Sequence, residues 1–235
     1  MSLKYAIIGC GRISPNHIAA AKECALDIVA LCDIDESKMS HTMDHFDLPK
    51  ETKKYVDYRQ MLEVEKPELV AICTESGKHG KIALACLAAG ANLIIEKPMT
   101  LSLEEADAII ALAHEKNLKV SACHQNRFNK SILKIREALE ENRFGKLLHG
   151  TAHIRWNRGK DYYTQAPWRG TWDQDGGALM NQCIHNIDLL RWMMGDDIVE
   201  VVGMTDNLIH DFIETEDLRS EERRVGKDCR YRLWP

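Results

Sequence analysis

A glycine-rich turn near the start of the chain has the residue types that cradle a phosphate group. Gly9-Cys10-Gly11-Arg12-Ile13-Ser14 follows an apolar run and precedes a helical pattern, the context that gives a GxGxxG-like motif weight. Gly9 would permit a tight turn, and Gly11 would let the backbone approach a pyrophosphate at the helix N-terminus. Ser14 replaces the third glycine and is still small enough for close helix–strand packing. Alone, this motif is weak evidence.

An acidic residue follows the second apolar run. Asp33 lies 24 residues after Gly9, where an acid accepts hydrogen bonds from the ribose hydroxyls of a dinucleotide. Its charge would repel a 2′-phosphate, Asp35 adds to this repulsion, and no Arg follows immediately. The alternative is that Asp33 only caps the next turn. Turn, strand and acid together predict dinucleotide binding, with NAD favoured over NADP.

The elements that must position these residues alternate along the first half of the chain. Short apolar runs predict strands, and longer periodic runs predict helices, the last with Ser102 as its N-cap. The predicted strands are 4–8, 28–32, 69–73, 92–95 and 120–123, and the predicted helices are 13–24, 55–62, 81–89 and 103–115. This alternation predicts a doubly wound parallel sheet covered on both faces.

After residue 124 the pattern changes. It predicts an amphipathic helix at 131–141, a strand at 147–156, an apolar helix at 178–194 ended by Gly195, and a strand at 198–204. All five tryptophans lie after residue 150. We therefore expect an α/β chain with a dinucleotide-binding domain at 1–124 and an α+β second domain at 125–218.

The last segment, residues 219–235, has dense charge, no apolar period and no helix cap. Two interpretations stay open for it. It is a solvated, disordered tail, or it is not native protein, in which case the second domain is cut short. We expect no regular element there.

Composition and charge exclude several classes of function. A hydrophobic content of 45% and a charged content of 29% are ordinary for a globular protein. The net charge of -5 argues against a nucleic-acid or membrane-surface binder. No apolar run approaches the roughly 20 residues of a bilayer span, and the first residues lack the features of a signal peptide. We expect a cytoplasmic protein without nucleic-acid or membrane partners.

The cysteines and histidines give no sign of disulfides or metal. The eight cysteines form no CxxC pair, and several lie within apolar patterns, which favours buried free thiols. The ten histidines show no metal-ligand spacing. His149 and His153 would lie roughly 13 Å apart in a strand, too far to share one ion. We predict no metal site.

Three further motifs accompany the glycine turn. Glu96-Lys97-Pro98 follows strand 92–95, Ser76-Gly77-Lys78-His79 follows strand 69–73, and GGALMNQCIHNID, residues 176–188, opens the apolar helix. From residue 4 to about 205 the set closely resembles the Gfo/Idh/MocA family, the glucose–fructose oxidoreductase and inositol dehydrogenase group. The resemblance implies a Rossmann domain, then a domain with a large, mostly antiparallel sheet. Family members are usually longer, which favours an incomplete second sheet.

The resemblance also implies the chemistry and its cofactor. Family members are oxidoreductases that use NAD or NADP on sugars, cyclic polyols or nucleotide sugars. The implied NAD contacts are Gly9, Gly11, Arg12, Ile13, Asp33, Thr74, Ser76, His79, Glu96, Lys97 and Gln125. Arg127 and Phe128 match a family pattern near the cofactor, and we expect their role to be structural.

Matched by position, Lys97 is the family's catalytic lysine and His185 its catalytic histidine. Oxidation of a secondary alcohol releases a hydride and a proton, and an imidazole is a base suited to neutral pH. Asn181 lies one helical turn before His185, so both could reach one sugar hydroxyl. We expect His185 to be the base and Lys97 to orient the substrate or share the proton. Swapped roles stay open, as do a packed His185 and a surface Lys97.

Asn181 departs from the family pattern, since many members have Asp there. Asn cannot accept a proton, so a Lys–Asp–His relay is not available. With Asn at this position, the chain resembles the subgroup that oxidises UDP-N-acetylglucosaminuronate at C3. This resemblance favours a nucleotide sugar as the substrate over a free monosaccharide or cyclic polyol. For Asp188, one turn after His185, a role in orienting the imidazole or capping backbone and no direct role both stay open.

Aromatic and basic residues cluster between residues 155 and 172. Aromatic faces suit the C–H faces of a sugar, and arginines suit phosphate or carboxylate. The predicted substrate contacts are Lys97, Arg155, Arg158, Trp168, Asn181 and His185. The alternative is that Trp156, Trp168 and Trp172 are core or interface residues, while an extended Tyr162-Tyr163 pair cannot face one side.

Two alternatives to a full enzyme stay open, a non-catalytic dinucleotide-binding regulator and a non-functional fragment. Retention of Lys97 and His185 favours the enzyme, because a regulator needs neither. The resemblance further implies a homo-oligomer if the chain is full length.

Overall fold

The computed structural model describes residues 2–195 and 198–225. The chain divides into two compact units, Met1–Cys123 and His124–Pro235. This division lies one residue before the boundary expected from the sequence.

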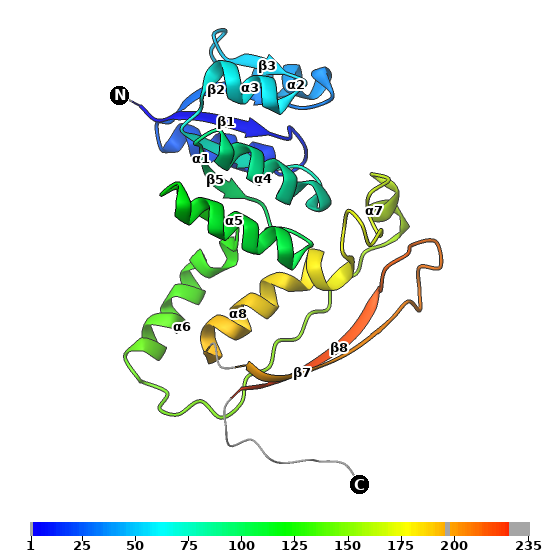
Figure 1. Cartoon of the computed structure of the whole chain (residues 1–235). Helices are drawn as coiled ribbons and strands as arrows, with labels where there is room; N and C mark the ends of the chain where they lie inside the picture. Colours follow the sequence, from blue (N-terminus) through cyan, green and yellow to red (C-terminus); the bar gives the residue numbers. More distant parts are fainter. Residues whose placement is uncertain (1, 196–197, 226–235) are drawn as a thin grey trace. The chain divides into compact units, whose positions relative to one another are not determined.

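The first unit is built on a six-stranded sheet (Figure 1, blue to green). Its order is β3-β2-β1-β4-β5-β6 and every pairing is parallel. The strands are β1 (Lys4–Ile8), β2 (Asp27–Cys32), β3 (Lys53–Tyr55), β4 (Leu69–Ile72), β5 (Asn92–Ile95) and β6 (Val120–Ala122). The predicted doubly wound parallel sheet is confirmed. The sequence analysis missed β3 because this short, polar edge strand carries no apolar pattern.

Helices cover both faces of this sheet. One face packs on α1 (Ser14–Glu23) and α2 (Glu36–Phe46). The other packs on α3 (Tyr58–Glu65), α4 (His79–Ala88) and α5 (Leu103–Glu115). Tyr5 and Ile7 of β1 face the first group, while Ala6 and Ile8 face the second. Each fully buried Ile or Leu contributes about 1.5–3 kcal/mol, so a sheet apolar on both faces forms only between two helix layers.

Helix caps decide where several of these helices begin. The Ser102 side chain accepts a hydrogen bond from the Glu105 N–H at 3.2 Å, so the predicted cap and helix bounds are confirmed. Asp35 likewise caps α2, since its carboxylate accepts the Ser37 N–H at 3.0 Å. The sequence analysis predicted no helix here. The polar surface of α2 hides the apolar period, although Met39 is fully buried.

The strand registers bring the carboxyl ends of β1, β2, β4, β5 and β6 to one edge of the sheet. Ile8 pairs with Cys32 and Ile72, Ile72 pairs with Ile95, and Ile95 pairs with Ala122. Ligands of open parallel sheets bind outside this edge. The residues that follow each strand here are Gly9, Asp33, Cys73, Glu96 and Cys123.

The second unit holds helices and a two-stranded sheet. Its elements are η2 (Gln125–Phe128), α6 (Lys130–Glu140), α7 (Lys160–Thr164), η3 (Leu179–Cys183), α8 (Ile184–Met194), β7 (Ile198–Asp206) and β8 (Leu218–Val225). The predicted apolar helix begins as one π-helical stretch, η3, and continues as α8.

The strand predicted at 147–156 is wrong, since the structure has no helix or strand at these residues. The described part of the second unit pairs β7 only with β8. An alternating sequence becomes a strand only beside a partner that takes its backbone hydrogen bonds.

The segment expected to lack structure begins with a strand. Leu218–Val225 pairs antiparallel with β7, from Asp206↔Leu218 to Ile198↔Val225. The expectation of no element is therefore wrong for residues 219–225, because backbone pairing with β7 does not require an apolar period. The rest of the predicted tail, 226–235, lies outside the described residues, and the non-native origin stays a prediction.

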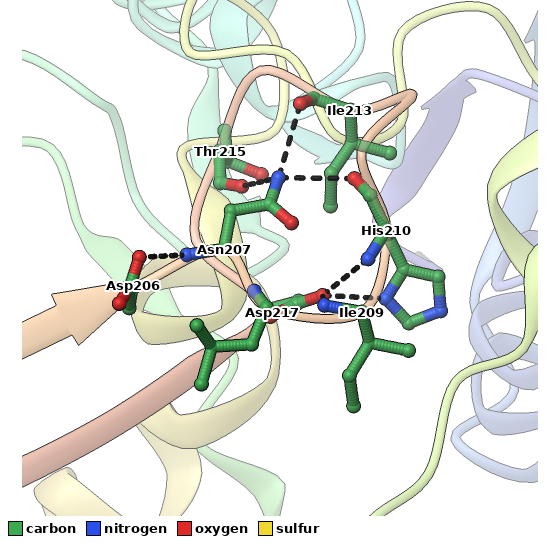
Figure 2. Close-up of polar contacts among 8 residues, drawn as sticks. Asp206, Asn207, Ile209, His210, Ile213, Thr215 and Asp217 are labelled. Carbon is green, nitrogen blue, oxygen red and sulfur yellow. Dashed lines mark hydrogen bonds and ion pairs between the residues drawn. The ribbon is translucent and has the colours of Figure 1, made fainter.

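The loop between β7 and β8 is held by two polar side chains (Figure 2). The Asp217 carboxylate accepts the N–H groups of Leu208, Ile209 and His210 at 2.7–2.9 Å. The Asn207 side-chain amide donates to the carbonyl oxygens of His210, Ile213 and Thr215. Asn207 and Asp217 thus tie the two ends of the loop to its backbone between residues 208 and 215.

Two further expectations concern cysteines and membranes. No disulfide joins the seven cysteines that the structure describes, and Cys10, Cys32, Cys73, Cys86 and Cys183 are buried. Cys229 lies outside the described residues. Among the described helices, none combines the length and apolar character that a bilayer crossing requires.

Candidate functional site

The glycine turn, residues 9–14, lies between β1 and α1. Gly9 has φ +96°, and its N–H donates to the Cys32 carbonyl oxygen at 2.8 Å. A Cβ at Gly9 would lie 2.6 Å from the backbone oxygen of Cys73. Both the left-handed conformation and the close approach of the backbone directly after β4 therefore require glycine here.

At Gly11, by contrast, the packing of the protein does not explain why the residue is a glycine. A Cβ there would meet no described atom within 4 Å, so the space beside it is open. Ser14 is 1% exposed and its Oγ donates to the Gly11 carbonyl oxygen at 2.9 Å, which fits the expected packing role. Ile13 is the N-cap of α1, and no described side chain caps it. Open space beside uncapped helix N–H groups fits a pyrophosphate.

Asp33 fixes the turn to the end of β2. One carboxylate oxygen accepts the Cys10 N–H at 2.8 Å, and the other accepts the Asp35 N–H at 2.9 Å. The capping alternative raised from the sequence is therefore part of its role. These bonds also hold a negative charge at the edge where the ribose of a dinucleotide binds.

Glu96, which follows β5, belongs to a largely buried polar group. Its carboxylate bonds to His17 Nε2 at 2.8 Å and accepts the Lys97 N–H at 3.2 Å. The side chains of His17 and Glu96 are only 11% and 14% exposed. Burial alone would raise the pKa of Glu96, but the hydrogen bond from His17 and its charge lower that pKa below the ordinary value. This group fixes the backbone that carries Lys97, and the next peptide bond, Lys97–Pro98, is cis.

Cys123, which follows β6, completes a set of three possible metal ligands with His17 and Glu96. The donor atoms of the three side chains all lie within 4.8 Å of one another. Burial and the charge of Glu96 raise the pKa of the Cys123 thiol to about 12, so it keeps its proton at neutral pH. The sequence analysis missed this set, because its members come from three distant segments.

His79 connects the loops that follow β4 and β5. It is 1% exposed, Nδ1 lies 2.7 Å from the Pro98 carbonyl oxygen, and Nε2 lies 3.0 Å from that of Thr74. Ser76, two residues after Thr74, is 6% exposed. The structure thus gives His79 a role in holding the Lys97–Pro98 loop, beyond the cofactor contact expected from the sequence.

Asn181 and His185 lie in consecutive parts of one helical segment, in η3 and α8. His185 is 7% exposed. π-helical turns are rare and occur often at functional sites. Gly176 and Gly177, which precede this segment, both have positive φ, so the glycine pair allows the chain to turn into it.

Asp188 binds Arg127 through two hydrogen bonds. Arg127 Nε lies 2.7 Å from one oxygen, and Nη2 lies 2.5 Å from the other. The guanidinium also lies over the Trp192 ring, 5.2 Å from its centroid. This ties η2 to α8, which gives Arg127 the expected structural role, whereas Phe128 is 74% exposed.

The aromatic and basic residues around α7 stack on one another. Arg158 lies over the rings of Trp156 and Tyr162, and Arg169 lies over those of Tyr162 and Trp168. Tyr162 and Tyr163 lie in a helix, so the extended geometry considered for them is wrong. Tyr163 is buried against His210, while Trp156, Trp172 and Arg155 are exposed.

The predicted site residues thus form two groups, each within one unit. The edge of the first sheet gathers the glycine turn with Asp33, Thr74, Glu96 and Lys97. The second unit presents Asn181 and His185 in one segment and Gln125 on the surface of η2. Sequence reasoning missed His17 and Glu216, whose partners are distant in sequence. It also missed Asp175, which bonds to Asn181 but lies just before the motif at residues 176–188.

A parallel sheet of this order, with a glycine turn after β1 and an acid after β2, defines a dinucleotide-binding Rossmann domain. The model of the oxidoreductase family's NAD-binding Rossmann fold matches residues 3–124, and that of the Gfo/Idh/MocA C-terminal domain matches residues 132–220. The chain belongs to the Gfo/Idh/MocA oxidoreductase family, as the motifs predicted.

Several relatives are known by sequence or structure. A solved structure of the WlbA dehydrogenase from Bordetella pertussis, in complex with NADH and UDP-GlcNAcA, is 30% identical with a TM-score of 0.88, and covers 95% of this chain and 68% of its own. Myo-inositol 2-dehydrogenase from Thermotoga maritima is 25% identical over 85% of this chain. Inositol 2-dehydrogenase from Pseudomonas fluorescens is 27% identical over 86%. The chain spans 57% of the length of each of these two enzymes.

Proposed function

We propose that this chain is an NAD-dependent dehydrogenase that oxidises a secondary hydroxyl of a sugar or nucleotide sugar. The observation that carries the proposal is the open space at Gly11, beside the uncapped start of α1 and the fixed carboxylate of Asp33. The family's NAD-binding fold over residues 3–124 supports it.

The proposed residues divide the work of the reaction. NAD, when bound, supplies the nicotinamide C4 that takes the hydride. His185 takes the hydroxyl proton, because an imidazole exchanges protons near neutral pH. Lys97 orients the hydroxyl or shares its proton, and the Glu96 and His79 contacts hold the Lys97 backbone. In the other assignment, which stays open, Lys97 is the base and His185 orients.

Asn181 binds the substrate without exchanging a proton, since an amide has no titratable group in this range. The rest of the proposed substrate contacts are Arg155, Arg158 and Trp168. Arginines that stack on aromatic rings suit a phosphate or carboxylate beside a sugar. A nucleotide sugar is therefore the preferred substrate, and the likeness to WlbA supports this choice.

The alternative substrate is a cyclic polyol or free monosaccharide, which the likeness to inositol dehydrogenases supports. Absorbance of reduced cofactor at 340 nm, followed with NAD and either UDP-N-acetylglucosaminuronate or myo-inositol, separates the two. Turnover of the first alone supports the nucleotide sugar, and turnover of the second alone replaces it. A chain that binds NAD and oxidises neither, nor any sugar of a wider panel, fits the regulator instead.

His185→Ala is the sharpest single test of the proposed base. We expect turnover to fall by at least about 100-fold, the contribution of a positioned base, while NAD affinity stays unchanged. His149→Ala, at an exposed histidine of the same unit, is the control and should keep full turnover. Equal turnover in the unchanged chain and His185→Ala would remove His185 from the mechanism.

Self-association and a cytoplasmic location complete the proposal. Val199, Val201, Val202 and Met204 of β7 are 53–72% exposed, and such apolar strands favour association with another copy. Light scattering of the purified chain measures this, and a monomer at all concentrations would exclude it.

A further inference from the structure

Two buried carboxylates bond to the first residues of the helical segment that carries Asn181, η3. Asp175 is 2% exposed and Glu216 is 4% exposed. Neither belongs to the motifs that the proposed function uses. We propose that Asp175 is a positioning residue, which fixes the end of the Asn181 side-chain amide that faces the substrate. This inference rests on the proposed function, in which Asn181 contacts the sugar.

The contacts of Asp175 leave one orientation for the amide. Oδ2 of Asp175 accepts the Gly170 N–H at 2.8 Å, and Oδ1 accepts a hydrogen bond from Nδ2 of Asn181. A carboxylate only accepts hydrogen bonds, so Asn181 must turn its NH₂ group toward Asp175. Charge-assisted bonds of this kind are stronger than neutral ones, which holds the orientation against exchange.

The backbone around Asp175 is fixed as well. The N–H groups of Asp175 and Gly176 both donate to the Thr171 carbonyl oxygen at 3.1 Å. The Gly170 carbonyl oxygen accepts the N–H groups of Glu214 and Thr215 at 2.9 and 3.2 Å. Asp175 therefore cannot follow a rotation of the Asn181 amide without losing several bonds.

Glu216 fixes the helical segment from the other side. Its Oε1 accepts the Leu179 N–H at 2.8 Å, two residues before Asn181. A Cβ at Gly177 would lie 2.0 Å from the other oxygen of Glu216, so this glycine makes room for the carboxylate. A negative charge at a helix N-terminus is also favourable. Asn181 thus starts from a fixed backbone and has a fixed side chain.

The orientation has a chemical consequence. With NH₂ turned to Asp175, the carbonyl oxygen Oδ1 of Asn181 lies on the opposite side of the amide. Through Oδ1, Asn181 then recognises the substrate as an acceptor, and the sugar offers a hydrogen-bond donor, a hydroxyl or N–H group, to this oxygen. A substrate with only an acceptor there, such as a keto group, is disfavoured.

Exchange of the two side chains tests this directly. In Asp175→Asn, the single oxygen of the introduced amide accepts the Gly170 N–H, so the introduced NH₂ group faces Asn181. The Asn181 side-chain amide must then flip, so that its oxygen accepts from this NH₂ group. We expect kcat with UDP-N-acetylglucosaminuronate to fall roughly 10- to 100-fold, as for other supporting contacts, with unchanged NAD affinity. The double variant Asp175→Asn/Asn181→Asp restores a donor–acceptor pair and an outward acceptor oxygen, so kcat should return to within about tenfold of the unchanged chain.

A measurement that does not depend on turnover tests the inference separately from the proposed function. In ¹⁵N-labelled full-length chain, the Asn181 side-chain amide, identified by its loss in Asn181→Ala, should exchange its protons slowly. Asp175→Asn should speed this exchange, and the Asp173→Asn control, at an exposed neighbour, should not. Slow exchange retained in Asp175→Asn, or a double variant with no higher kcat than Asp175→Asn, overturns the inference. An unchanged chain that oxidises no sugar defeats the proposed function alone, because the exchange result still decides the role of Asp175.

Discussion

At the scale of single residues, the two glycines of the turn are required for different reasons. Gly9 is required by the fold, since its φ is +96° and its Cβ position is filled by the Cys73 backbone. Gly11 borders open space, and nothing described in the protein excludes a side chain there. The fold alone therefore requires the first glycine, and we propose that the second serves ligand binding.

This difference predicts opposite behaviour of two alanine variants. Gly9→Ala should lower the free energy of unfolding by roughly 1–3 kcal/mol for the left-handed backbone alone, with more from the close contact. Gly11→Ala should unfold like the unchanged chain and bind NAD at least about tenfold more weakly, a loss of about 1.4 kcal/mol. Denaturant unfolding and NAD titration of both variants measure this. Normal NAD affinity in a folded Gly11→Ala would remove the pyrophosphate from this turn.

The role of a residue could be predicted from the sequence where its neighbours along the chain define that role. Gly9 and Asp33 follow apolar strands at a motif spacing, so their place at the sheet edge followed from the pattern. His17 and Glu216 bond to partners 79 and 37 residues away. Asp175 lies six residues from Asn181, but only the turn around Gly170 brings them together. Such pairs arise from the folded chain, so one sequence gives no signal for them.

At the scale of elements, the predictions succeeded where a helix or strand is specified by its own residues. Helix α5 has its predicted bounds because Ser102 caps it and its apolar period is regular. Residues 147–156 alternate like a strand yet form none, because strand pairing depends on a neighbour. Conversely, β8 forms from a charged sequence because β7 supplies that neighbour.

The loop between β7 and β8 shows how one carboxylate can specify an element (Figure 2). Burial alone would raise the pKa of Asp217, but the N–H groups of Leu208 and Ile209 and the His210 ring lower it below the ordinary value. A depressed pKa in the folded state means that ionised Asp217 stabilises the fold. This stabilisation is fully present above the unfolded pKa and is lost as pH falls through the folded pKa.

Asp217→Asn should therefore destabilise the second unit at neutral pH. We expect a cost of about 1–3 kcal/mol, because the amide turns donors toward buried N–H groups. Hydrogen exchange at Leu208, Ile209 and His210 should accelerate, and the stability difference from the unchanged chain should shrink below about pH 4. Asp211→Asn, at an exposed residue of the same loop, is the matched control. An equal difference at neutral and at strongly acidic pH would contradict the role of this charge.

At the scale of the whole molecule, the first unit has a hydrophobic core of its own. Both hydrophobic clusters of the Rossmann sheet are made only of residues from the first unit. The described sheet of the second unit has two strands, with exposed apolar side chains along β7. The first unit therefore has the core of an independent domain.

A fragment of residues 1–123 should fold without the rest of the chain. We expect cooperative thermal unfolding and NAD affinity within about tenfold of the full chain, since a domain with its own core folds as a unit. Calorimetry and NAD titration of the fragment check both. A fragment that unfolds without a transition would show that the second unit contributes to the core of the first.

A calorimetric titration of the full chain with NAD and with NADP tests most directly whether the glycine turn and Asp33 hold a dinucleotide. We expect saturable binding of one NAD per chain, at least about tenfold tighter than NADP, because the Asp33 carboxylate held by Cys10 and Asp35 would accept hydrogen bonds from the ribose hydroxyls and repel a 2′-phosphate. A chain that unfolds cooperatively and yet binds neither dinucleotide would contradict the assignment.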